Sequence, residues 1–257
     1  MKKLESQRQC LLQDSKRFEG SNWGLLHVFI NKCSMNSGLS LAQYSYLPLN
    51  TDKLFLPFRP EFNPVTSCNV VTLGVGNEVT YERALQEHYP ACRFYGADPF
   101  QETGNIFSTV GQVFFTAIDN VTSPDQHLHV MQNGTYNWKS KVKVTSLGSF
   151  LRNMAQINIV HYLSMDVEGA EYRLLPYLTK NGSFAKESSE TVICQISAEL
   201  HGPLKFYNLT SPAFESIWRT VLSNSPYVPL RAYPPGNHHR FNFFNMENEE
   251  CVKMFLA

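Results

Sequence analysis

Two glycines stand between a β-like apolar run and a helix-like amphipathic run in the stretch VVTLGVGNEVTYERAL, residues 70–85. Such a junction needs a tight turn, and a backbone without side chains lets a ligand approach the N-terminus of the helix. We therefore assign Gly74 and Gly76 to a binding turn. A nicotinamide dinucleotide site would add a third glycine at about Val79. Its absence favours a smaller nucleoside ligand, although a bare structural turn remains the alternative.

An acidic residue follows the next β-like run. Asp98 ends the stretch FYGAD, 22 positions after Gly76. At that place a carboxylate can accept hydrogen bonds from both hydroxyls of a ribose. A solvated loop aspartate is the structural alternative, but the glycine turn that precedes it favours a nucleoside site.

Further ionisable residues end two later β-like runs. Asp166 follows an apolar run in LSMDVEGAEYRLL, where Gly169 permits a turn and Glu171 suits the first turn of a helix as a cap. Glu199 and His201 end the run ETVICQISAEL and its continuation, on one face of an extended chain. A histidine there could act as a general base, or simply be a hydrogen-bonded loop residue.

The elements that position these residues alternate from Cys68 onward. We expect strands at 68–75, 92–99, 111–119, 157–167 and 190–200, and helices at 80–89, 146–154, 170–178 and 211–224, the last with Ser211 as N-cap. Two extended segments, 227–234 and 241–246, follow. This order predicts an α/β fold, a Rossmann-like doubly wound, mostly parallel sheet with an antiparallel C-terminal strand.

The first part of the chain lacks this alternation. Residues 1–65 predict an irregular N-terminal appended segment with one short helix at 23–33 and a proline- and aromatic-rich stretch packed on something else. We therefore expect the main domain to span residues 66–257.

Composition bears on partners and compartment. The 257 residues carry no formal net charge, and no run reaches the length of a membrane-spanning helix, so we expect neither nucleic acid nor membrane as a partner. The polar N-terminus predicts a cytoplasmic protein, and the six cysteines lack zinc or redox spacing, so most of them should be free, buried thiols. Four glycosylation sequons disagree and would fit the secretory pathway if an N-terminal signal is missing: Asn120, Asn133, Asn181 and Asn208.

The stretches VVTLGVGNEVTYERAL, FYGADP and above all LSMDVEGAEYRLL resemble the FkbM-type methyltransferases, a branch of the S-adenosylmethionine-dependent Rossmann-like enzymes, over roughly residues 66–250. The resemblance implies S-adenosylmethionine as cofactor, with Gly74 and Gly76 under its methionine part and Asp98 on its ribose. It also implies that Asp166 lies near the transferring methyl group. Related enzymes often carry an acid two positions before the first glycine, where this chain has Thr72. Asp119, after the third β-like run, is placed near the adenine or in a loop.

The function that this resemblance implies is O-methylation of a hydroxyl on a small-molecule or carbohydrate acceptor. An oxygen acceptor needs a base, for which we consider His201 and Asp166, with Glu168 and Glu199 in support. The main prediction involves no metal; a variant has these four residues converge on a divalent cation. Alternatives from other classes are a catalytically inactive binding module, an NAD-dependent dehydrogenase and a secreted interaction protein. Neither the acceptor nor the oligomeric state follows from the sequence.

Overall fold

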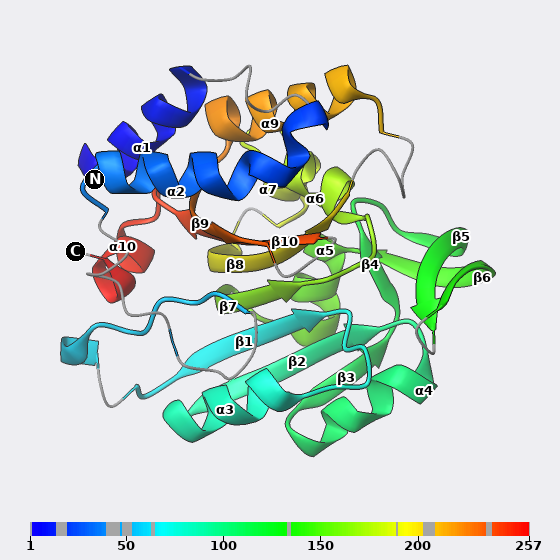
Figure 1. The fold of residues 1–257 in the computed structure, drawn as a ribbon. Helices are drawn as coiled ribbons and strands as arrows, with labels where there is room; N and C mark the ends of the chain where they lie inside the picture. The colour runs from blue at the N-terminus through cyan, green and yellow to red at the C-terminus, as the bar shows by residue number, and fades with distance from the viewer. Residues whose placement is uncertain are drawn as a thin grey trace.

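The structure, a computed structural model, describes residues 2–13, 20–39, 47, 53–62, 65–132, 135–188, 190–202, 209–234 and 238–256. Its main sheet has seven strands in the order β3-β2-β1-β7-β8-β10-β9 (Figure 1). Their bounds are β1 (Cys68–Leu73), β2 (Cys92–Asp98), β3 (Gln112–Phe115), β7 (Ile159–Met165), β8 (Val192–His201), β9 (Tyr227–Tyr233) and β10 (His238–Asn245).

Strand direction in this sheet matches the prediction. β1, β2, β3, β7 and β8 pair in parallel, whereas β10 pairs antiparallel with both β8 and β9. The chain order also reverses between β1 and β7, where a doubly wound sheet forms its ligand crevice. The Rossmann-like fold with an antiparallel C-terminal strand is therefore confirmed.

Helices flank the sheet. In Figure 1, α1, α2 and α9 lie beside β9 at one end of the sheet, and α3 lies near β1 and β2 at the other. The α-helices are α1 (Lys2–Gln13), α2 (Leu26–Asn36), α3 (Thr80–His88), α4 (Gln101–Gly104), α5 (Leu147–Ser149), α6 (Glu171–Tyr177), α7 (Ser183–Glu187), α9 (Ser211–Asn224) and α10 (Glu249–Phe255). Turns of 3-10 helix lie at Gly20–Leu25, Pro60–Phe62 and Asn105–Thr109. Within the described ranges, no helix has both the length and the apolarity to cross a membrane.

The prediction missed a second sheet. Residues 111–119, predicted as one strand, break at Thr116 into β3 and β4 (Ala117–Asp119), and β4 pairs with β6 (Thr135–Ser146). β6 forms a hairpin with β5 (Ser123–Gln132), which extends from the right of the molecule in Figure 1. β5 is mostly polar, whereas β6 alternates apolar residues at Tyr136, Trp138, Val142 and Val144, a strand signal that the prediction did not use.

Two helix predictions need correction. The segment 146–154 is one short α-helical turn followed by a π-helical turn at Phe150–Ala155. Helix α9 is capped by Thr210 and not by Ser211, because the Thr210 hydroxyl accepts the N–H of Ala213.

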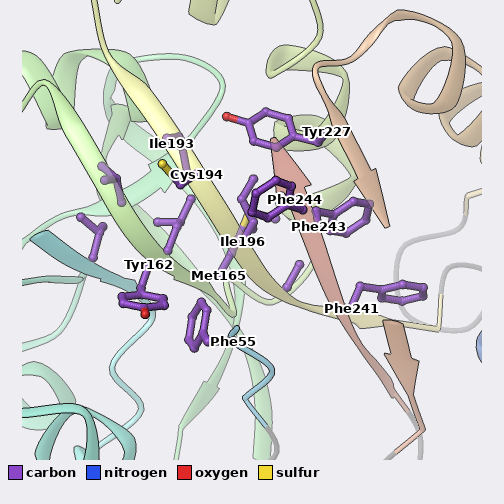
Figure 2. Close-up of a cluster of buried hydrophobic side chains, with 14 of the residues drawn as sticks. Phe55, Tyr162, Met165, Ile193, Cys194, Ile196, Tyr227, Phe241, Phe243 and Phe244 are labelled. Carbon is purple, nitrogen blue, oxygen red and sulfur yellow. The ribbon is translucent and has the colours of Figure 1, made fainter. Parts of the chain in front are cut away.

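Aromatic side chains fill the core on both faces of the C-terminal half of the sheet. Phe241 and Phe243 of β10 contact Trp218 of α9, and Phe244 contacts Phe255 of α10. Figure 2 shows these β10 side chains in one cluster with residues of β7 and β8. The aromatic residues of the predicted extended segment 241–246 are thus core, because side chains alternate across a strand buried on both faces.

The N-terminal segment packs on this sheet. The side-chain amide of Gln7 donates to Pro229 O at 2.9 Å, and Asn31 pairs with both backbone groups of Ala232. Further along, the backbone of Leu56 exchanges two hydrogen bonds with the Gln195 amide. The expectation of irregular chain packed on another element therefore holds for residues 53–59, but not for the start of the segment, where α1 and α2 form in place of one short helix. The domain boundary at residue 65 stays a prediction, and residues 40–46 and 48–52 lie outside the described residues.

The expectation of free cysteines is wrong. The six cysteines form three disulfides, Cys10–Cys33, Cys68–Cys92 and Cys194–Cys251. Spacing could not reveal them, because each pair is brought together by tertiary structure. Cys68 and Cys92, for example, begin neighbouring parallel strands in register.

Candidate functional site

A cavity of about 1090 Å³ lies where β1, β2 and β7 end. Its wall also includes residues of the β5–β6 hairpin and Arg240 of β10. This is the crevice that the order of the elements predicts, at the carboxyl ends of parallel strands. Its volume is within the range of a cofactor together with part of a second substrate.

The glycine turn forms one part of the cavity wall. Gly74, Gly76 and Asn77 all have positive φ angles, of 80°, 65° and 64°. A Cβ atom on Gly74 would stand 1.8 Å from the backbone oxygen of Asp166, whereas one on Gly76 would meet no atom within 4 Å. Gly74 thus lets β1 and β7 continue side by side into the crevice, and Gly76 leaves open space beside the cavity.

Asp98 lies at the end of β2, buried against this turn. Its Oδ2 accepts the N–H groups of Val75 and Gly76, at 3.1 and 3.3 Å. Its Oδ1 accepts the N–H of Phe100 and the hydroxyl of Thr103, at 2.9 and 2.7 Å. Since a carboxylate has about four lone-pair sites, these bonds engage the whole group. In this structure Asp98 therefore holds the glycine turn in shape, and its contact with a ribose stays a prediction.

Asp119 lies at the end of β4 and is paired with an arginine that the sequence analysis did not single out. Arg173 of α6 donates to both carboxylate oxygens, at 2.9 Å from Nε and 2.6 Å from Nη2. The bidentate pair joins the second sheet to the helix that follows the Asp166 segment. Both residues line the cavity, and the contact of Asp119 with the adenine stays a prediction.

Asp166 follows β7 directly beside the glycine turn, because its N–H donates to Leu73 O at 3.0 Å. The side chain is 24% exposed, and its Oδ2 accepts from Arg240 Nη2 at 3.3 Å. The other oxygen, Oδ1, is buried without a hydrogen-bond partner. Burial alone would raise the pKa of this carboxyl, but the charges of Arg240, Lys53 and His201 hold the pKa below its usual range. Asp166 is therefore an anion at neutral pH.

Arg240 joins the ends of three strands. It pairs with Asp166 and, through the same Nη2, with Glu199 at the end of β8, which lies opposite it in the β8–β10 ladder. Both carboxylates and the arginine line the cavity. Arg240 was not predicted as a site residue, because the predicted extended segment 241–246 begins one residue after it, whereas β10 begins at His238.

His201 lies behind these residues and is not part of the cavity wall. Its Nε2 is 3.2 Å from Glu199 and 3.3 Å from Glu168. Burial alone would lower its pKa, but the Glu199 hydrogen bond and the charges of Glu171, Glu168 and Asp166 raise the pKa to about 9. His201 is thus an imidazolium at neutral pH, and its protonation balances part of the surrounding negative charge.

Two groups of ionisable residues in the described ranges have ligand atoms within 4.8 Å of one another. The first group is Glu199, His201 and His238, and the second is Asp166, Glu168 and His201. The four residues of the metal variant therefore divide between the two groups, and of these four only His201 belongs to both. Arg240 forms ion pairs with two of these carboxylates, those of Asp166 and Glu199. Its guanidinium thus supplies a positive charge that a metal cation would otherwise supply.

Glu171 lies in the first turn of α6, as the sequence predicts, but its side chain closes the turn before the helix and does not cap the helix. Its two carboxylate oxygens accept the N–H groups of Val167 and Gly169, at 2.8 and 2.6 Å. These bonds close the turn in which Glu168 and Gly169 have positive φ angles of 53° and 101°. This closed turn fixes Asp166, the residue before it, at the cavity wall.

Glu82 of α3 is a further acid at the cavity that the sequence analysis missed. It is 1% exposed, and its Oε1 accepts the hydroxyl of Thr72 at 2.6 Å. Its Oε2 is buried without a hydrogen-bond partner. The signal was present, because a glutamate next to Tyr81 on the buried face of a helix breaks the amphipathic pattern.

At the far side of the cavity the β5–β6 hairpin contributes Gln126, His127, Leu128 and Trp138. The Trp138 side chain is 70% exposed. A large aromatic surface beside polar side chains therefore stands at the mouth of the cavity.

Solved structures resemble the chain only distantly. TrmK from M. capricolum, in complex with its natural cofactor product S-adenosyl-homocysteine, has 13% identity and a TM-score of 0.35, covering 74% of this chain and 69% of that one. A human methyltransferase 10 domain containing protein has 11% identity and a TM-score of 0.34, covering 92% and 98%. A single-residue mutant of MtNAS has 12% identity and a TM-score of 0.34, covering 94% and 81%.

Sequence comparison gives the family. A search of curated proteins found no match. The family described as "Methyltransferase FkbM domain" matches residues 33–225, about three quarters of the chain. The match includes the glycine turn, Asp98, Asp119, Asp166, and the strand that carries Glu199 and His201. The chain thus belongs to the FkbM methyltransferase family, whose methyl donor is S-adenosylmethionine.

Proposed function

We propose that the protein transfers a methyl group from S-adenosylmethionine to a hydroxyl oxygen of a small-molecule or carbohydrate acceptor. The observation that carries this proposal is the position of Asp166, an anionic carboxylate at the cavity wall beside the glycine turn. The glycine turn leaves room for a bound methyl donor, and the ionised acid beside it can take the proton that an acceptor hydroxyl must lose.

The residues present fit the cofactor. Gly76 leaves open space beside the cavity, and Glu82 offers a buried carboxylate oxygen that has no partner. Gly74 and Gly76 would hold the methionine part. When bound, S-adenosylmethionine would supply a methyl group on a positively charged sulfur, so that an oxygen nucleophile in line with the carbon–sulfur bond can take the methyl group and displace the sulfur.

The protein has then to orient the acceptor and remove its proton. Asp166 accepts the proton of the acceptor hydroxyl. Arg240 orients the Asp166 carboxylate by pairing with its Oδ2 atom. His201, protonated behind the cavity wall, stabilises the negative charges of Glu168 and Glu199. In this assignment Asp166 is the catalytic residue, and Glu199 and His201 are positioning residues.

The cavity mouth supports a carbohydrate or similar polyhydroxylated acceptor. Trp138 presents an exposed ring beside Gln126 and His127, which line the same cavity. An aromatic face can cover the apolar side of a sugar ring, while neighbouring polar side chains bind its hydroxyls.

The experiment that tests the function is methyl transfer from labelled S-adenosylmethionine to a panel of sugars, glycans and small alcohols. Asp166→Asn should lower transfer by a factor of at least 100 and leave binding of S-adenosylhomocysteine within about threefold. Glu102→Gln is the matched control, because Glu102 is an exposed acid on the same cavity. Full transfer by Asp166→Asn would contradict the assignment of the base.

Two alternatives have their own outcomes in this assay. Binding of the cofactor without methylation of any acceptor would favour a binding module without catalysis. A divalent cation at the Asp166, Glu168 and His201 group would make transfer sensitive to a chelator and restorable by Mg²⁺, Mn²⁺ or Ca²⁺.

We also propose that the protein works in an oxidising compartment. Three disulfides use every cysteine of the chain, and disulfides persist mainly outside the cytosol. Asn181, one of the four sequon residues, is exposed in the turn between α6 and α7. Asn120 is half-buried, and Asn133 and Asn208 lie outside the described residues.

A further inference from the structure

We propose that Glu82 binds the ammonium group of the methionine part of S-adenosylmethionine, in place of the acid that position 72 lacks. The inference rests on the proposed function only through its cofactor. Thr72, two positions before the first glycine, has no charge of its own. Its hydroxyl instead donates to a carboxylate that α3 brings into the same part of the cavity wall.

The geometry leaves one oxygen of this carboxylate for a ligand. Oε1 of Glu82 is held by Thr72 at 2.6 Å, and Thr72 is also 2.7 Å from the hydroxyl of Tyr81. Oε2 is buried without a hydrogen-bond partner. Leaving a buried carboxylate oxygen unsatisfied costs free energy that a charged donor would recover. A primary ammonium, with three donors, is such a group.

The surroundings fit a zwitterionic ligand end. Lys53 faces the same end of the cavity, with its ammonium 5.5 Å from the centre of the Tyr81 ring, and its charge acts on Glu82. The methionine part of the cofactor carries an ammonium and a carboxylate. Glu82 and Lys53 offer one group of the opposite sign for each of these charges.

The charge state of Glu82 gives the proposal a second observable. Burial raises the pKa of this carboxyl to about 7, although hydrogen bonds from Thr72 and Tyr81 and the charge of Lys53 act in the opposite direction. Because only the ionised carboxylate attracts an ammonium, the affinity for the cofactor should rise between pH 6 and pH 8. Binding at pH 6.5 should release a proton.

The test is calorimetric titration of the whole chain with three ligands. S-adenosylhomocysteine has both charges of the amino-acid end, its decarboxylated form keeps only the ammonium, and 5′-methylthioadenosine has neither. Glu82→Gln should weaken the first two by a factor of about 10 to 100 and change the third by less than threefold. Glu78→Gln, an exposed acid on the same cavity, is the matched control and should change none of them.

The outcomes separate this inference from the proposed function. If the unaltered protein does not bind S-adenosylhomocysteine, the cofactor assignment fails. If it binds and Glu82→Gln binds equally well, or weakens all three ligands alike, the role of Glu82 is contradicted. Should Glu82→Gln not fold, the unaltered protein decides: at pH 6.5, titrations in two buffers of different ionisation enthalpy should detect proton release with S-adenosylhomocysteine and none with 5′-methylthioadenosine. Equal proton release with both ligands would overturn the proposal.

Discussion

The guanidinium of Arg240 donates to the carboxylate of Asp166 across the cavity wall, at 3.3 Å. The two residues are 74 positions apart in the chain and come from an antiparallel strand and the end of a parallel one. The antiparallel C-terminal strand thus serves the site directly, because it places a cation beside the acid that ends β7.

Removing this cation should destabilise the protein. Arg240 is nearly buried and also pairs with Glu199, so Arg240→Met would remove the arginine charge from two carboxylates. We expect a loss of about 3–5 kcal/mol in the free energy of unfolding, measured in urea at pH 7. Adding Glu199→Leu should recover part of the loss, because an apolar pair needs no counter-charge. Strictly additive losses in the double variant would contradict this account.

His201 predicts a pH dependence of stability. Its folded pKa of about 9 lies above the usual value of about 6.5, so its protonated form stabilises the folded state below pH 6.5. That stabilisation, about 3 kcal/mol in full, should disappear as the pH rises toward 9. His201→Asn should therefore lower the free energy of unfolding more at pH 6 than at pH 9.5, each time compared with the unaltered protein. Parallel stability curves would show that His201 is neutral in the folded protein.

The two glycines of the turn predict different results for the same substitution. Gly74→Ala would place a methyl group 1.8 Å from the backbone oxygen of Asp166, so we expect a loss on the order of 3–5 kcal/mol in stability. Gly76→Ala meets no atom within 4 Å and should lose only about 1–2 kcal/mol, from its positive φ angle. It should nevertheless weaken binding of S-adenosylhomocysteine. Equal losses of stability would show that the turn rearranges.

A disulfide should contribute more to stability the longer the chain segment that it closes, with a logarithmic dependence on length. Cys194–Cys251 spans 57 residues and Cys10–Cys33 spans 23, for which chain entropy gives about 4 and about 3 kcal/mol. Paired serine substitutions, compared by urea unfolding, measure each contribution. Alkylation should modify the cysteines only after reduction; modification without a reductant would contradict the pairing.

Expression in a secreting eukaryotic host tests the compartment. We expect a glycan at Asn181, since the exposed turn that contains it gives a transferase access. A glycosidase-sensitive mass increase that is lost in Asn181→Gln would support the secretory pathway. Asn120→Gln is the control, because the half-buried Asn120 should carry less glycan. A fully unmodified product would favour a protein that does not pass through that pathway.

The sequence by itself determined the order of the elements and the places where they end. Apolar runs separated by amphipathic ones are local patterns, and they specify a parallel sheet whose ends carry Gly74, Asp98, Asp166 and Glu199. The DVEGAE stretch is equally local, since Glu171 accepts the N–H groups of Gly169 and Val167, two and four residues before it in the chain.

Tertiary structure decided which of these residues meet and in what charge state. The pairs Arg240–Asp166, Arg173–Asp119 and Glu82–Thr72 join different elements, and no spacing along the chain encodes them. The same holds for the three disulfides and for the pairing of β6 with β4 and β5. Burial and the neighbouring charges make His201 a cation and Asp166 an anion, because a pKa depends on what surrounds a group in space.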